Sequence, residues 1–148
     1  MKVKRRFSAP REKVWDAWTN REQLKKWWGP KDFSAPEATS DFREGGSYLY
    51  CVQAPTGQKF YNAGLFIEID PPRFLMFTGS FADEYGNIVP GSAYGMDGHD
   101  QGSQTVEFEA VEGGTRLTLR QKGLGHKERT EESRLWNQSF DKLAVVLS

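Results

Sequence analysis

The chain of 148 residues contains a single cysteine, Cys51, so it cannot form an internal disulfide bond. It has no apolar run near the ~20 residues of a membrane-spanning helix, and its charged N-terminus lacks the apolar core of a signal peptide. A lone cysteine is typical of proteins in a reducing compartment. We therefore expect a cytoplasmic protein with no membrane span.

An excess of charge of either sign is also missing, because 20 lysines and arginines balance 20 aspartates and glutamates. Nucleic-acid-binding domains usually carry a basic excess, so we expect no nucleic-acid partner. The chain has only two histidines and neither an HExxH nor a CxxC motif, which argues against a metal site. Its glycines form neither the GxGxxG nor the P-loop pattern, and we expect no cofactor.

Aromatic residues, in contrast, are abundant: ten phenylalanines, five tyrosines and five tryptophans. At the start of the chain, residues 2–8 alternate between apolar and basic side chains and predict a strand that ends at Pro10. Two short helices are predicted next, the second capped by Asn20 and ended by Gly29-Pro30. These two helices carry four of the tryptophans: Trp15, Trp18, Trp27 and Trp28.

The middle of the chain is predicted to be rich in β-structure. Alternating patterns between turn signals place strands at 33–42, 47–53, 59–69, 74–81, 104–111 and 115–121. Pro36 interrupts the first of these, so we expect that strand at an edge of the sheet or bulged. The last two strands alternate apolar and polar residues, which favours an antiparallel sheet with one covered face. The length predicts one domain, residues 1–148.

The C-terminal segment 127–147 contains no glycine or proline and predicts a long amphipathic helix of about 30 Å. Its apolar positions form one face: Trp136, Phe140, Leu143, Ala144 and Leu147. Continued towards the N-terminus, the same face becomes polar at Arg129, Glu132 and Ser133. The helix either covers the mouth of a pocket there or projects its first turns into solvent.

Residues 82–102 hold five glycines and one proline, and a loop of this length is uncommon inside a compact domain. The segment is either a lid over a pocket or a poorly ordered excursion. Its apolar side chains are Tyr85, Ile88, Val89, Tyr94 and Met96.

Several motifs along the chain resemble those of one protein family. The opening motif is Arg5-x-Phe7-x-Ala9-Pro10-x-x-x-Val14-Trp15-x-Ala17-Trp18-Thr19, and Trp27-Trp28-x-Pro30 follows it. Later matches are Asp41-x-Arg43-x-Gly45-Gly46, Pro71-Pro72, Gly114-Thr115-Arg116-Leu117-Thr118-Leu119, and Trp136 with Leu143-Ala144. In order and spacing they resemble the activator-of-heat-shock-ATPase-like (Aha-type) proteins of the START-like, or SRPBCC, superfamily.

The resemblance implies an α+β helix-grip fold, in which an antiparallel sheet wraps around the long C-terminal helix and two short helices follow the first strand. It also implies a cavity between sheet and helix. Relatives in the superfamily bind lipids, sterols or aromatic polyketides there, and some catalyse cyclisation or dehydration.

Candidate site residues follow from this expected cavity. The ligand-binding candidates are Trp28, Tyr48, Tyr50, Phe66, Phe77, Phe81, Met96, Glu132, Trp136 and Phe140. Acid–base catalysis needs a carboxylate or imidazole among apolar groups, and Glu132 and His99 are the candidates. Cys51 is expected to be a small buried hydrophobe. Arg5 either neutralises an acidic group of the ligand or pairs with a neighbouring strand.

Three functions are therefore open. The first is binding of a small apolar or aromatic molecule, and the second is a cyclase or dehydratase that uses the same cavity. The third is a co-chaperone-like protein-interaction module. The resemblance implies that a separate N-terminal domain supplies much of the ATPase stimulation in the eukaryotic co-chaperone. Because the chain starts at the START-like strand, we do not expect direct ATPase activation. Apolar side chains on both faces of some strands also predict a homodimer.

Overall fold

The computed structural model describes residues 1–96, 101–123 and 126–148. The elements in chain order are β1 (Lys2–Phe7), α1 (Arg11–Thr19), α2 (Arg21–Leu24), β2 (Ser34–Ser40), β3 (Ser47–Gln53), β4 (Lys59–Asp70), β5 (Phe74–Ala82), the 3-10 helix η1 (Gly91–Tyr94), β6 (Gln101–Val111), β7 (Gly114–Lys122) and α3 (His126–Leu147). This order confirms the prediction of a strand, two short helices, a series of strands and a long helix.

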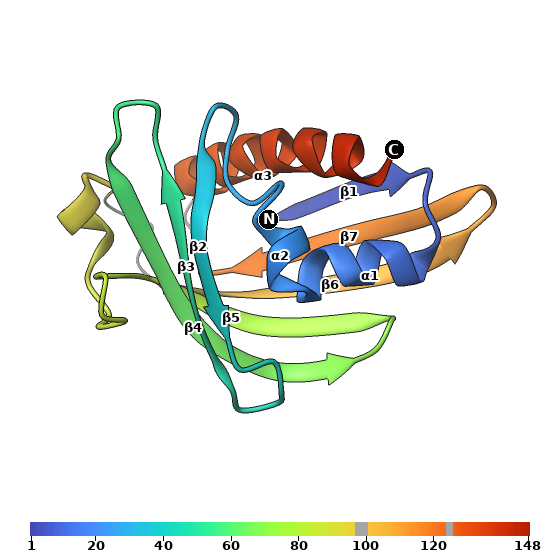
Figure 1. Ribbon diagram of the computed structural model, residues 1–148, viewed down its shortest axis with the longest axis horizontal. Helices are drawn as coiled ribbons and strands as arrows, with labels where there is room; N and C mark the ends of the chain where they lie inside the picture. Colours follow the sequence, from blue (N-terminus) through green and yellow to red (C-terminus); the bar gives the residue numbers. More distant parts are fainter. Residues whose placement is uncertain (97–100, 124–125) are drawn as a thin grey trace.

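The strands form one antiparallel sheet of seven strands in the order β1-β7-β6-β5-β4-β3-β2. Consecutive strands from β2 to β7 are neighbours, and β1 returns to pair with β7 at the far edge. The sheet is curled, and Figure 1 shows α3 lying across it, with α1 and α2 on the same side. The predicted α+β helix-grip fold is therefore confirmed.

Local signals in the sequence explain most of the element boundaries. Asn20 caps α2, where its side chain accepts a hydrogen bond from the backbone N–H of Glu22 at 3.0 Å. The predicted edge position of the strand around Pro36 is confirmed, because β2 ends the sheet and its register shifts between Ser34 and Glu37. The second short helix differs most from its prediction, because α2 ends at Leu24 and leaves Trp27 and Trp28 in the turn and loop that follow it. Strand β6 begins at Gln101 rather than at residue 104.

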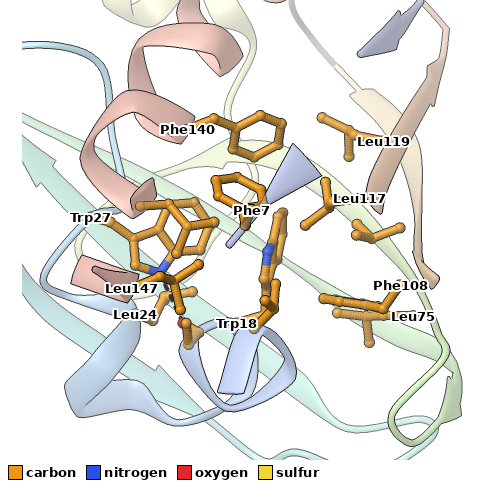
Figure 2. Close-up of a cluster of buried hydrophobic side chains, with 14 of the residues drawn as sticks. Phe7, Trp18, Leu24, Trp27, Leu75, Phe108, Leu117, Leu119, Phe140 and Leu147 are labelled. Carbon is orange, nitrogen blue, oxygen red and sulfur yellow. Dashed lines mark hydrogen bonds between the residues drawn. The ribbon is translucent and has the colours of Figure 1, made fainter. Parts of the chain in front are cut away.

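The hydrophobic core lies between the helices and the inner face of the sheet, and Trp18 is at its centre (Figure 2). Its ring packs edge-on against Trp27 and Phe108, at centroid distances of 4.9 and 6.2 Å, and stacks on Trp136 at 5.9 Å. The Trp27 indole N–H donates to the Ala17 carbonyl at 2.8 Å, which ties the turn after α2 to α1. Trp18 of α1 thus contacts the segment that follows α2, the helix α3 and the sheet.

The described residues of the segment after β5 make contacts with one another and with the end of β5. Ala82 forms a bridge with Ile88, and the Tyr94 hydroxyl donates to the Ala82 carbonyl at 2.6 Å. Tyr85 and Ile88, expected as lid material, are 80% and 63% exposed. Of the segment's apolar side chains named above, only Met96 lines the cavity described below.

The outer face of the sheet exposes Leu65 and Ile67 of β4, which are 46% and 44% accessible. These side chains are consistent with the predicted homodimer, whose existence stays a prediction. Within the described residues, no helix is long and apolar enough to cross a membrane.

Candidate ligand-binding cavity

A cavity of about 560 Å³ lies between the sheet and the N-terminal half of α3. Strands β3 to β7 contribute one side, α3 the opposite side, and the segment 28–33 that follows α2 closes it laterally. This volume falls within the ~300–1,000 Å³ of typical small-molecule sites. The predicted cavity between sheet and helix is therefore present in the fold.

Aromatic rings make up much of the cavity wall. They come from the segment 28–33, three strands and α3, and they are Trp28, Phe33, Tyr48, Phe60, Phe77, Phe81 and Trp136. The rings of Trp28 and Trp136 pack edge to face with their centroids 5.5 Å apart, so the segment 28–33 contacts α3 in the wall of the cavity. Such a surface favours flat, apolar molecules.

Seven of the ten ligand-binding candidates line this cavity: Trp28, Tyr48, Phe77, Phe81, Met96, Glu132 and Trp136. The other three do not, because they are packed inside the core. Tyr50 lies against Trp28 at 5.3 Å, Phe66 against Phe42 at 4.9 Å, and Phe140 against Phe7 at 6.0 Å. The structure thus places Tyr50, Phe66 and Phe140 in the core instead of in the wall of this cavity.

Of the two candidates for acid–base catalysis, only Glu132 belongs to the described residues. Glu132 borders the cavity from α3, together with Glu131. His99 lies outside the described residues. Cys51 is buried at 1% exposure and is absent from the cavity wall, and burial raises the pKa of its thiol. It therefore fits the predicted role of a small buried hydrophobe. Among the residues that the structure describes, no cluster of His, Cys, Asp and Glu could hold a metal ion.

Arg5 adopts neither of its two expected roles. It lies on β1, and its guanidinium donates to the Asp141 carboxylate at 2.7 Å and to the Asn137 side chain at 3.1 Å. Both partners belong to α3 rather than to a strand. Arg5 therefore fastens the helix to the edge of the sheet and is not part of the cavity wall.

The segment 28–33 is held against α3 through its backbone carbonyls. The Lys142 ammonium donates to the carbonyls of Pro30 and Phe33 at 3.2 and 3.0 Å. The Ser139 hydroxyl donates to the carbonyl of Gly29 at 2.9 Å. Gly29 has a φ of 102°, which favours glycine, and a Cβ there would lie 3.0 Å from Val52. These contacts fix the position of Trp28 and Phe33.

The sheet side of the cavity also carries polar groups that sequence reasoning missed. Gln104 of β6 and Gln121 of β7 are direct partners in the strand register, and both are buried. The Trp136 indole N–H donates to Gln121 Oε1 at 3.2 Å. Gln104 lies in the same wall, and its Oε1 accepts no hydrogen bond from the described part of the chain.

Tyr48 adds a neutral hydroxyl to this polar region. Burial raises the pKa of Tyr48 above its usual range, so the phenol keeps its proton at ordinary pH. That proton is donated to the Thr78 carbonyl at 2.5 Å. The oxygen is thus left as an acceptor towards any further partner.

Comparison with known proteins places the chain in a family. A family model described as Activator of Hsp90 ATPase homolog 1-like protein matches residues 8–148. The chain belongs to this family. The family confirms the resemblance carried by the sequence motifs. No curated protein matches the chain.

Solved structures of similar proteins share the fold of this family member. A protein from Nitrosomonas europaea is 27% identical with a TM-score of 0.80, over 99% of this chain and 92% of that one. A protein from Arthrobacter aurescens is also 27% identical with a TM-score of 0.80, over 99% and 84%. The AHSA1 protein from Silicibacter pomeroyi, 23% identical over 98% and 94% with a TM-score of 0.80, shows the likeness of fold alone. Family and fold support a ligand-binding or related role.

Proposed function

We propose that the protein binds a small apolar or aromatic molecule in the cavity between the sheet and α3. The observation that carries the proposal is the aromatic wall around a volume of about 560 Å³. The aromatic wall presents apolar surface inside this pocket, and a bound molecule would remove that surface from water. The few polar groups in the wall would orient such a molecule.

The charged side chains in the wall come from α3 and from the segment 28–33. They are Lys31, Asp32, Glu131, Glu132 and Arg134. The strands contribute only uncharged side chains to the described part of the wall. A charged ligand group placed against the sheet would find no opposite charge there, and burial of an unpaired charge is costly. The sheet side of the cavity therefore favours an uncharged part of the ligand.

Two measurements test the proposal. Native mass spectrometry of the purified protein should detect a bound small molecule that denaturation releases. Titration with the neutral fluorophore N-phenyl-1-naphthylamine should give saturable enhancement with one site per chain. The absence of both a retained molecule and probe binding would refute the proposal.

A matched pair of variants on α3 locates the probe. Leu135 lines the cavity, whereas Val145 is 73% exposed and lies outside its wall. Leu135→Trp should fill part of the cavity and weaken probe binding at least ~10-fold, about 1.4 kcal/mol. Val145→Trp adds the same side chain at the surface and should leave the affinity within about twofold. If both variants bound the probe with equal affinity, the probe would bind outside this cavity.

A further inference from the structure

The Oε1 atom of Gln104 is a polar atom without a hydrogen-bond partner among the described residues, on the sheet side of the cavity. Gln104 is 7% exposed, it lines the cavity, and its Oε1 is buried without a hydrogen bond among the described residues. Its neighbour Gln121 differs, because Gln121 Oε1 accepts from the Trp136 indole. Leaving a buried amide oxygen unpaired costs free energy in the empty protein.

The sheet around Gln104 leaves room for this amide. Gly79 of β5 and Gly102 of β6 are register partners, and both line the cavity. A Cβ on Gly79 would lie 3.3 Å from Gln104 Oε1, and a Cβ on Gly102 would lie 3.5 Å from Gln104 Nε2. The amide therefore occupies the space above two residues that lack side chains, in the wall of the cavity.

A second acceptor borders the same place. The Tyr48 hydroxyl oxygen is also 3.3 Å from the Cβ position of Gly79, and its proton is already donated to the Thr78 carbonyl. The described wall from the strands contains no charged side chain that could pair with an ionised ligand group here. Burial of an unpaired charge is costly, so an uncharged partner is favoured.

We propose that the ligand carries an uncharged hydroxyl group that hydrogen-bonds to the Gln104 amide beside Tyr48, above Gly79 and Gly102. A hydroxyl both donates and accepts, so it matches the amide whether the carbonyl oxygen or the NH2 group faces the cavity. The ligand class is thus a flat apolar molecule with a phenol or alcohol at one end. This inference rests on the proposed function and specifies its polar contact.

The test compares 2-naphthol with 2-methylnaphthalene, which has nearly the same shape but no hydroxyl. Dissociation constants are measured by NMR titration of the ¹⁵N-labelled protein, in which the Gln104 side-chain amide signals are also followed. The ratio of the two constants should shift about 10-fold against 2-naphthol in Gln104→Met. In Gln58→Met, the same change at an exposed turn position, the ratio should be that of the unsubstituted protein.

The outcomes separate the two proposals. If neither naphthalene binds, the cavity is not a site for such molecules and the proposed function is contradicted as well. If both bind and the ratio is the same in Gln104→Met, the hydroxyl contact is wrong while the binding function stands. That second result is also expected if an internal water alone satisfies Gln104.

The stability of the empty protein gives an independent readout. If Gln104 serves a ligand, Gln104→Met removes an unsatisfied amide and should raise Tm by about 2–4 °C. If Gln104 is a structural residue with partners in the fold, the same substitution should lower Tm, and the inference is then overturned.

Discussion

Trp136 and Phe140 are one turn apart on α3, and their truncation should have different energetic consequences. Phe140 is fully buried, whereas Trp136 is partly buried and lines the cavity. Phe140→Ala loses about 2 kcal/mol of transfer free energy and leaves a closed void that costs about as much again. We expect a total loss of about 4 kcal/mol from the free energy of unfolding.

Trp136→Ala should cost only about 2 kcal/mol, because the space that it leaves opens into the existing cavity and adds no new closed void. What is lost is the stacking on Trp18 at 5.9 Å and the hydrogen bond to Gln121 at 3.2 Å. Urea unfolding of the ligand-free variants measures both values, provided that the m-values agree. An equal or larger loss for Trp136→Ala would show that Trp136 is closed core, and the cavity geometry would be wrong.

Three further predictions concern the surroundings of the cavity. Lys142→Met removes the donor to the carbonyls of the segment 28–33 and should cost about 2 kcal/mol in urea unfolding and weaken N-phenyl-1-naphthylamine binding. Burial raises the pKa of Tyr50 above its usual 10.0, so above about pH 10 the unfolded state loses this proton first and stability falls as pH rises. In Tyr50→Phe that fall should be shallower by about 1.4 kcal/mol per pH unit, measured by unfolding at several alkaline pH values. Asp141→Asn breaks the ion pair with Arg5, but Asp141 is 71% exposed, so the unfolding free energy should change by less than about 1 kcal/mol.

The fold could be predicted from the sequence because its signals are local. The alternation in residues 2–8, the cap at Asn20 and the apolar face of residues 127–147 each depend on neighbours within a few positions, and the structure places elements at all three. The cavity wall depends instead on distances across the sheet. Tyr48 and Tyr50 point to the same side of β3, yet only Tyr48 lines the cavity, since Trp28 packs on Tyr50 at 5.3 Å. No pattern within the strand distinguishes the two tyrosines.

The polar groups in the wall did leave a signal in the sequence. Side chains at every second position of a strand face the same side of the sheet. On β6, Gln104 therefore faces the same side as the buried Val106 and Phe108. On β7, Gln121 faces the same side as the buried Leu117 and Leu119, so each glutamine interrupts an inward-facing apolar series. A buried amide at such a position needs a partner. Gln121 has one in Trp136, and Gln104 has none among the described residues, although two glycines leave space beside it. The aromatic residues thus account for the volume and shape of the cavity, and the Gln104 amide accounts for its polarity at one point, where a ligand with a hydroxyl group would be distinguished from a purely apolar one.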